Sequence, residues 1–210
     1  MKRSTGRSDE GTVGDFQGYE IIVVGTSWGG LAAVRAILSA LPADFDIPIV
    51  VVQHRHRDSE SNLAGFLTRN THLRVCDVED KMPIEPGRLY FAPPDYHTMV
   101  ENGFLALSTE APVRYSRPSI DVMLTSAADA YERRTIGVIL TGANADGAQG
   151  LRRVADVGGL AIVQDPATAE VATMPEAAIA AVPQARVFPL ERIAGYLATL
   201  PSIHAARGQQ

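Results

Sequence analysis

The sequence has a single cysteine, Cys76, among its 210 residues. One thiol excludes an internal disulfide and leaves no cysteine cluster for a structural zinc site. Cys76 lies in the run Leu73-Arg74-Val75-Cys76-Asp77-Val78, which has the composition of a strand. We therefore expect it to be a small core residue and look for the chemistry of the chain elsewhere.

Long apolar runs and an excess of positive charge are also missing. No run approaches the roughly 18 apolar residues of a membrane span, and residues 1–18 lack the apolar core of a signal peptide. The 19 Lys and Arg against 24 Asp and Glu give a formal net charge of -5, which argues against a nucleic-acid binder held by bulk charge. We expect a cytoplasmic protein with no membrane insertion and no nucleic-acid partner.

Short apolar runs alternate with helix-like segments along the chain. The expected strands are 21–24, 47–52, 74–78, 135–140, 160–164 and 186–188. The expected helices are 31–41, 61–70, 119–132, 145–157, 175–181 and 190–200. This alternation predicts an α/β fold with a doubly wound, mostly parallel sheet and helices on both faces, in three α/β/α layers.

The alternation is interrupted in the middle of the chain. Brief apolar runs at 87–92, 97–101 and 104–108 are separated by Pro93-Pro94-Asp95 and by Asn102-Gly103. Asn-Gly between apolar runs is the strongest short-range signal for a hairpin. We therefore expect an antiparallel hairpin inserted into the α/β pattern.

No internal repeat or linker divides the sequence. We expect one domain over residues 19–200, preceded by a disordered lead-in over 1–18 and followed by a flexible tail over 201–210. The lead-in is rich in Ser, Gly, Thr and charged residues, which cannot form a packed core.

Candidate site residues follow three of the expected strands, where ligands bind in open parallel sheets. Ser27 lies in the turn Gly25-Thr26-Ser27-Trp28-Gly29-Gly30 between a strand and a helix. His54 follows the second strand, and Asp146 follows the strand over 135–140. A turn before a helix also presents free N–H groups and the positive helix end. Such a turn can serve a nucleophile with an oxyanion pocket, or it can hold a phosphate.

Ser27, His54 and Asp146 could act as a catalytic triad. A serine hydroxyl needs a base to take its proton, and the base needs an acceptor that fixes its tautomer. The chain order Ser, His, Asp differs from that of α/β-hydrolases, but triads are defined by geometry. Thr26 adjoins Ser27 and has a more hindered hydroxyl. Asp95 and Asp121 are the competing acids, with turn and capping roles as their simpler interpretation.

Two other kinds of site compete with the triad. His54 and His56 form a His-x-His pair that only Asp or Glu could complete, but no metal-binding motif follows at ligand spacing, so we expect no metal and no cofactor. The glycine turn departs from G-x-G-x-x-G, and Gln53-His54 stands where an acidic ribose ligand should end the second strand. Spacing alone therefore favours a serine hydrolase modestly over a non-catalytic nucleotide- or anion-binding module.

Several segments together resemble the catalytic domain of the chemotaxis protein-glutamate methylesterase family, CheB. The resembling segments are Val24-Gly25-Thr26-Ser27-Trp28-Gly29-Gly30, Val52-Gln53-His54, Arg117-Pro118-Ser119-Ile120-Asp121, residues 137–148 and Met174-Pro175-Glu176-Ala177. They occur in the same order from about Tyr19 to Leu200. The resemblance implies hydrolysis of γ-glutamyl methyl esters on the cytoplasmic helices of methyl-accepting chemoreceptors, with release of methanol. It also implies a capacity to deamidate receptor glutamines.

The resemblance assigns roles to single residues. It implies that Ser27 is the nucleophile, His54 the base and Asp146 the orienting acid. Backbone N–H groups near Trp28 and Ala143 would stabilise the oxyanion. Trp28 stands where the family commonly has threonine, and loss of one oxyanion donor can cost roughly 10²–10³-fold in rate. Ala143 replaces a typical methionine, which a backbone role tolerates.

Three arginines lie near the expected site in a net-acidic chain: Arg55, Arg57 and Arg117. We expect them to bind acidic side chains around a receptor methylation site. The usual family enzyme carries an N-terminal receiver domain, and here about 18 polar residues precede the first strand. The expectation is therefore a stand-alone esterase domain. An alternative is a serine hydrolase that acts on another protein ester or amide.

Overall fold

The computed structural model describes residues 18–54, 63–69 and 71–204. Its main sheet has seven strands in the order β10-β9-β8-β1-β2-β5-β3, and all neighbouring strands are parallel. The strands are β1 (Ile21–Thr26), β2 (Ile49–Gln53), β3 (Arg74–Asp77), β5 (Arg88–Phe91), β8 (Thr135–Ile139), β9 (Leu160–Gln164) and β10 (Arg186–Phe188). The expected parallel sheet is confirmed.

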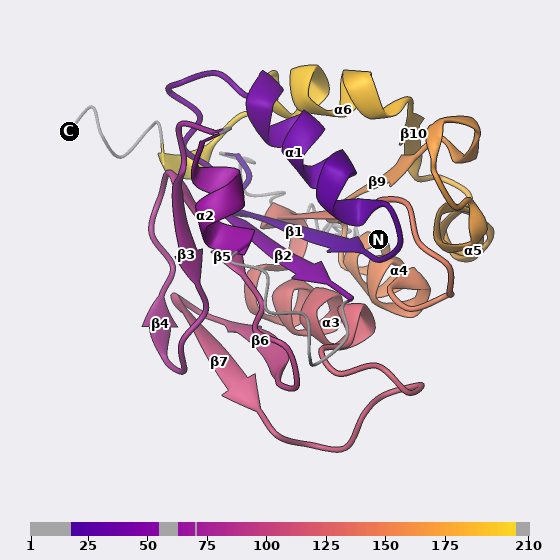
Figure 1. The fold of residues 1–210 in the computed structure, drawn as a ribbon, viewed down its shortest axis with the longest axis horizontal. Helices are drawn as coiled ribbons and strands as arrows, with labels where there is room; N and C mark the ends of the chain where they lie inside the picture. Colours follow the sequence, from indigo (N-terminus) through magenta and orange to yellow (C-terminus); the bar gives the residue numbers. More distant parts are fainter. Residues whose placement is uncertain (1–17, 55–62, 70, 205–210) are drawn as a thin grey trace, which may run out of the picture.

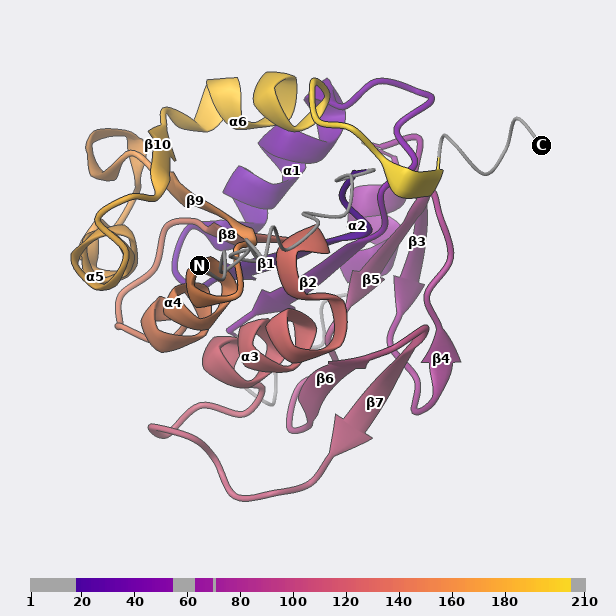
Figure 2. The ribbon, with the colours of Figure 1, turned by 180° about the vertical axis from the view of Figure 1, so that it is seen from behind.

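Helices cover both faces of this sheet (Figures 1 and 2). One face carries α1 (Gly30–Ala40), α2 (Leu63–Thr68) and α6 (Leu190–Leu197). The other carries α3 (Ile120–Tyr131), α4 (Ala148–Asp156) and α5 (Thr173–Ala181). Two short 3₁₀ helices, η1 (Glu132–Arg134) and η2 (Pro166–Thr168), join elements. The three-layer α/β/α architecture is therefore confirmed.

The side chains of β1 show why the sheet needs both helical layers. Ile21 and Val23 belong to the core under α3 and α4, whereas Ile22 and Val24 belong to the core under α1 and α6. Successive side chains of a strand point to opposite faces. A strand that is apolar at every position must therefore be covered on both faces, as parallel sheets usually are.

The interruption expected in the middle of the chain is a second, antiparallel sheet. It consists of β4 (Met82–Pro83), β7 (Phe104–Ser108) and β6 (His97–Glu101). The Asn102-Gly103 turn joins β6 to β7, and Gly103 adopts a φ of 91°, which a side chain would strain. Val100 and Leu105 of this sheet are buried in the same core as α3. The predicted hairpin is confirmed, with β4 as a third strand.

Three expectations differ from the structure. Cys76 is half-buried on the edge strand β3 rather than in the core. Helix α4 begins at Ala148 and not at Ala145, because residues 145–147 form the loop that carries Asp146. Helix α5 begins at Thr173, so that Pro175 lies in its first turn, where a missing N–H costs nothing.

The described chain ends beside its start. The N–H of Tyr19 donates to the carbonyl of Pro201 (2.7 Å), and the N–H of Ile203 donates to the carbonyl of Tyr19 (3.1 Å). Ile203 is buried. These bonds extend the packed part of the chain to residue 204, beyond the expected boundary at residue 200.

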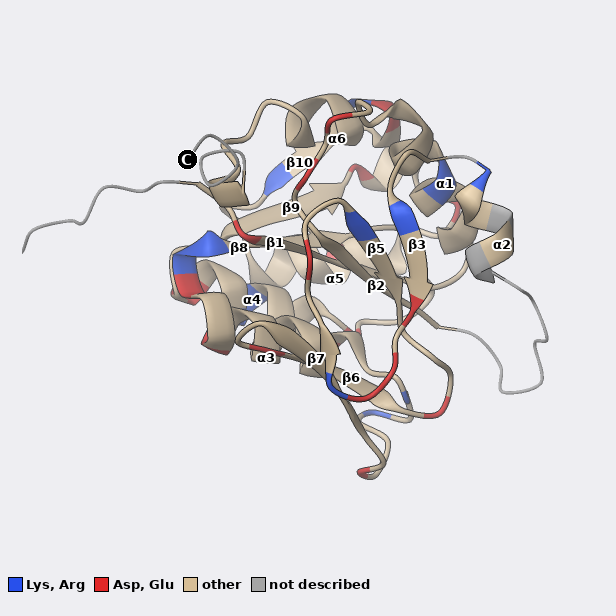
Figure 3. Cartoon of the chain, turned by 90° about the vertical axis from the view of Figure 1, so that its left-hand side faces the viewer, with Lys and Arg blue, Asp and Glu red and all other residues tan. Residues whose placement is uncertain are grey.

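Charged residues do not gather in one patch on the side of the molecule shown in Figure 3, where acidic and basic residues are interspersed. Among the described residues, no helix combines the length and the apolar character that crossing a membrane requires.

Candidate active site

The candidate residues meet at the carboxyl edge of three adjacent strands. Ser27 follows β1, His54 follows β2 and Asp146 follows β8, and these strands are neighbours in the order β8-β1-β2. The helices that follow β1 and β8 cover opposite faces of the sheet. The loops after these two strands therefore diverge, and they leave a crevice between them.

Close contacts fix the turn that carries Ser27. A Cβ at Gly25 would lie 2.1 Å from a methyl group of Ile120, and Gly29 has a φ of 77°. The N–H of Ser27 donates to the carbonyl of Thr141 (3.0 Å). Thr26 is fully buried, and its hydroxyl donates to the same carbonyl (2.9 Å). Thr26 is therefore inaccessible to a substrate, which leaves Ser27 as the hydroxyl of this turn.

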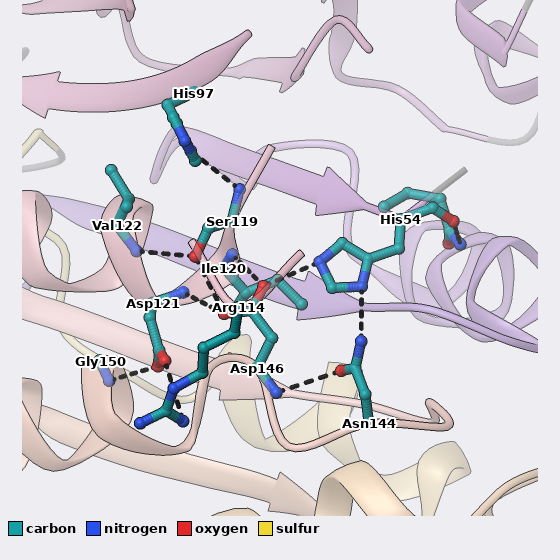
Figure 4. Close-up of polar contacts among 11 residues, drawn as sticks. His54, His97, Arg114, Ser119, Ile120, Asp121, Val122, Asn144, Asp146 and Gly150 are labelled. Carbon is teal, nitrogen blue, oxygen red and sulfur yellow. Dashed lines mark hydrogen bonds and ion pairs between the residues drawn. The ribbon is translucent and has the colours of Figure 1, made fainter. Parts of the chain in front are cut away.

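His54 is hydrogen-bonded to Asp146 through its Nε2, with Nε2 and Oδ2 separated by 2.8 Å (Figure 4). A carboxylate only accepts, so this bond places the ring proton on Nε2. The other nitrogen, Nδ1, then carries the lone pair and accepts a long hydrogen bond from the Asn144 amide (3.4 Å). Nδ1 is therefore the basic nitrogen of this histidine.

Four donors surround the buried carboxylate of Asp146. Besides His54, they are the Ser119 hydroxyl (2.9 Å) and the N–H groups of Ile120 (2.7 Å) and Asp121 (3.0 Å). Ser119 is the N-cap of α3, so the carboxylate lies at the positive end of that helix. Burial by itself raises the pKa of Asp146, but the bonds from His54, Ile120 and Asp121 outweigh it and hold the pKa below its ordinary value.

The two competing acids have other partners. Asp121 accepts from the N–H of Gly150 (2.8 Å) and lies 3.8 Å from the Arg114 guanidinium. Burial raises the pKa of Asp121, and the nearby charge of Asp146 raises it further. Asp95 pairs with Arg117 at 2.6 Å. Asp146 is thus the carboxylate that bonds to His54.

An open cleft of about 370 Å³ lies over these residues. It is lined by Ser27, His54, Tyr115, Ser116, Arg117, Pro118 and Asn144. Within the described part of the chain, the Ser27 hydroxyl makes no hydrogen bond, and neither do the N–H groups of Trp28 and Ala143. Candidate nucleophile and base thus share one cleft without a bond between them, as is common in unliganded sites.

The side chain of Trp28 does not line the cleft. It is 66% exposed, and its Nε1 donates to a carboxylate oxygen of Glu170 (2.8 Å). The backbone of Trp28 follows Ser27 directly, so the exposed ring leaves the space in front of Ser27 open.

The predicted cationic residues divide into two groups. Arg117 lines the cleft, but its guanidinium donates to Asp95 and to the carbonyls of Thr109 and Glu110. Arg55 and Arg57 lie outside the described residues, as does His56 of the His-x-His pair. In the part of the chain that the structure describes, no group of three or more His, Cys, Asp or Glu side chains could hold a metal ion.

Sequence reasoning missed several residues of the site. Ser119 binds Asp146, Asn144 approaches His54, and the Gln53 amide donates to the carbonyls of Ser27 (2.6 Å) and His54 (3.0 Å). Ser119 is the first residue of the helix expected over 119–132, and a serine at a helix start is an N-cap signal. Tyr115 carries no comparable signal, because its exposure depends on the path of the loop.

Comparison with known proteins identifies the family. A profile described as CheB methylesterase matches residues 22–197. A protein of Leptospira interrogans named "Putative protein-glutamate methylesterase/protein-glutamine glutaminase" is 47% identical over 177 residues, which cover 84% of this chain and 92% of that protein. A protein-glutamate methylesterase/protein-glutamine glutaminase of Anaeromyxobacter dehalogenans is 41% identical and is matched over 83% of this chain and 51% of its own length.

A solved structure agrees with these relatives. The crystal structure of the Thermotoga maritima CheB methylesterase catalytic domain superposes with a TM-score of 0.81 at 36% identity. The match covers 86% of this chain and 97% of that one. The chain spans nearly the whole of the Leptospira relative and about half of the Anaeromyxobacter relative. The profile, the relatives and the shared fold together show that this chain belongs to the CheB methylesterase family of hydrolases.

Proposed function

We propose that this chain hydrolyses γ-glutamyl methyl esters on methyl-accepting chemoreceptors in the cytoplasm, with Ser27, His54 and Asp146 as its catalytic triad. The observation that carries the proposal is the bond from His54 to Asp146 at the edge of the cleft that Ser27 lines. Relatives named protein-glutamate methylesterases support the substrate class.

In the first step, Ser27 attacks the ester carbonyl carbon. His54 takes the hydroxyl proton on Nδ1, because Nε2 already carries the proton that it donates to Asp146. Asp146 is ionised at neutral pH, since its pKa lies below the ordinary value. It stabilises the imidazolium that forms and keeps the ring oriented toward the cleft.

The negative charge that develops on the carbonyl oxygen needs hydrogen-bond donors. We assign this role to the N–H groups of Trp28 and Ala143, which lie on the loops after β1 and β8 and make no hydrogen bond with the described residues. Trp28 stands where the family commonly has threonine. Because its ring is exposed, the larger side chain leaves the backbone N–H available as a donor, which supports this assignment.

The remaining steps return the enzyme to its starting state. The C–O bond to the methoxy group breaks, and the imidazolium of His54 gives its proton to the departing oxygen, so that methanol leaves. Water then attacks the acyl carbon and passes a proton to His54, the bond from this carbon to the Ser27 Oγ breaks, and His54 returns the proton to Oγ. The receptor glutamate and the free Ser27 hydroxyl are restored.

Deamidation of receptor glutamines is a second proposed activity. Relatives are named protein-glutamine glutaminases as well as methylesterases. An amide carbonyl would be attacked by Ser27 in the same way, and His54 would protonate the departing nitrogen as ammonia forms. Both activities therefore share one acyl-enzyme.

Substrate binding is proposed for part of the arginine set. Arg55 and Arg57 would contact acidic side chains near the methylation site. Arg117 is a weaker candidate, because its guanidinium already donates to Asp95 and to two carbonyls.

The experiment that tests the proposal is methanol release from methyl-esterified chemoreceptor. The Ser27→Ala variant should lose roughly 10⁶-fold in kcat, which is the usual cost of removing a nucleophile. Ser39→Ala makes the same change on the exposed surface of α1 and should leave the rate unchanged. Methanol release that survives in Ser27→Ala would contradict the triad. Saturable nucleotide binding without reactivity at Ser27 would favour the non-catalytic alternative.

A further inference from the structure

The connection between β7 and α3 forms one wall of the cleft. We call residues 109–118 the arm. Figures 1 and 2 show it swinging out beyond the edge of the molecule before it returns to α3. Tyr115, Ser116, Arg117 and Pro118 of the arm line the cleft together with Ser27, His54 and Asn144. A substrate that reaches Ser27 must therefore lie against the arm.

Arg117 closes the base of the arm. Its guanidinium donates to Asp95 (2.6 Å) and to the carbonyls of Thr109 and Glu110 (3.0 Å each). The arm leaves the small sheet at Thr109 and Glu110 and returns through Arg117, so one side chain ties its two ends together. Arg117 thus serves the shape of the arm and has few donors left for a substrate.

His97 ties the arm to the catalytic region. Its Nε2 lies 3.2 Å from the carbonyl of Ala111, and its Nδ1 lies 3.2 Å from the N–H of Ser119. A carbonyl only accepts and an N–H only donates, so the buried ring is neutral with its proton on Nε2. Ser119 in turn donates to Asp146 (Figure 4). The arm is therefore held at a defined position relative to the proposed triad.

The tip of the arm is a tight turn that presents Tyr115 to solvent. Val113 and Ser116 exchange two backbone hydrogen bonds (3.1 and 2.9 Å). The two residues between them, Arg114 and Tyr115, have φ values of 46° and 67°. A turn with two positive φ angles favours Asn and Gly, and bulky residues persist there only under constraint. The Tyr115 ring is nevertheless fully exposed. Packing of this side chain within the chain therefore does not explain why a tyrosine occupies the turn.

A second aromatic residue is exposed beside the same cleft. Among the large hydrophobic side chains of the described residues, Tyr115 and Trp28 are the two most exposed. Tyr115 lines the cleft, and Trp28 directly follows Ser27. Exposed aromatic side chains around a site are typical of surfaces that bind proteins.

We propose that Tyr115 is a docking residue for the protein part of the substrate, the receptor segment that carries the glutamyl ester. The identity of this partner rests on the proposed function. An ester on a side chain reaches Ser27 only if the segment bearing it crosses the rim of the cleft, where the arm places the Tyr115 ring. Arg114, beside it and more than half exposed, provides a cation suited to an acidic segment.

Direct binding tests this inference without requiring turnover. Calorimetry would measure the affinity of the Ser27→Ala chain for a methylated receptor fragment, with and without Tyr115→Ala. The dissociation constant should rise about 10-fold, as for an aromatic contact at a protein interface. Tyr115→Phe keeps the ring and should remain within about 2-fold. Phe104→Ala removes an exposed aromatic from the far end of β7 and should change nothing.

A small probe separates docking from chemistry. Labelling of Ser27 by a fluorophosphonate in the otherwise unchanged chain should proceed at the same rate with Tyr115→Ala. The docking role would be overturned if Tyr115→Ala left the dissociation constant unchanged, or if the receptor fragment did not bind at all. It would also be overturned if Tyr115→Ala slowed the labelling of Ser27 by the same factor by which it weakened binding. Failure of the proposed function has a different signature, which is methanol release that does not depend on Ser27.

Discussion

At the level of single residues, hydrogen bonds to the backbone position the proposed nucleophile and base relative to each other. The amide of Gln53 donates to the carbonyls of both Ser27 (2.6 Å) and His54 (3.0 Å). Gln53 is buried, and its Oε1 has no partner in the described part of the chain. The side chain therefore acts through its two N–H donors, which join the turn after β1 to the end of β2.

Replacing Gln53 by Glu should disrupt this link. A carboxylate of the same size cannot donate, and it would face two carbonyl oxygens. We expect kcat for methanol release to fall about 10- to 100-fold, as for a small displacement of reacting groups. Gln149→Glu makes the same chemical change at an exposed position of α4 and should have no effect. Steady-state kinetics of both variants checks the prediction, and equal rates would contradict it.

At the level of elements, the helix that follows β1 is packed directly against the sheet edge that carries the candidate site. Helix α1 begins at Gly30, where a Cβ would lie 2.2 Å from the Thr26 hydroxyl and 2.4 Å from the Oε1 of Gln53. The absence of a side chain at Gly30 therefore allows the helix to start immediately after the turn that carries Ser27. The turn is tight because the start of α1 packs against the ends of β1 and β2.

Gly30→Ala should accordingly damage the site more than the fold. The added methyl group must displace Thr26 or Gln53, and overpacking of this kind costs about 1–3 kcal/mol. Because the displaced groups hold Ser27, we expect a loss of about 100-fold in kcat/KM. Gly195→Ala in α6 is the matched control, since nothing lies within 4 Å of its added Cβ.

The control should be neutral or slightly more stable, because alanine restricts the unfolded chain. Urea unfolding and methanol release of both variants provide the measurements. A Gly30→Ala enzyme with full activity would show that the turn can move without consequence.

At the level of the whole molecule, Asp146 connects parts of the chain that are distant in sequence. Its carboxylate joins the loop after β8 to the N-terminus of α3 and to His54 after β2. The pKa of this group lies below its ordinary value. A carboxylate with a lowered pKa stabilises the fold while it is ionised, that is, above the pKa of the unfolded chain, about 3.9.

The pH dependence of stability follows from this sign. Asp146→Asn should lower the free energy of unfolding by about 1–3 kcal/mol at pH 7, because at least one buried donor loses its acceptor. The difference between the two proteins should narrow below about pH 4, as the wild-type carboxylate takes up a proton in both states. Urea unfolding of both proteins between pH 7 and pH 3 measures it. If the difference in free energy of unfolding stayed constant or widened on acidification, Asp146 would not be a carboxylate with a lowered pKa in the folded chain.

Much of the fold follows from local patterns in the sequence. Apolar runs of strand length, Pro42 after the first helix and Asn102-Gly103 in the hairpin predict elements that the structure contains. The errors lie at element ends, as in residues 145–147, which belong to a loop. Asp146 and Gly147 are weak helix formers, and Gly147 is the left-handed N-cap of α4, with a φ of 97°, so the helix starts only at Ala148.

The sequence by itself determined the alternation of strands and helices, and it placed Ser27, His54 and Asp146 in the segments that follow three strands. Apolar periodicity and turn chemistry act over a few residues, so they can be read from the chain. Only the tertiary structure decided that Asp146 bonds to His54, that Arg117 bonds to Asp95, and that Tyr115 borders the cleft. Such pairings join residues 92 and 22 positions apart, and they depend on how complete elements pack.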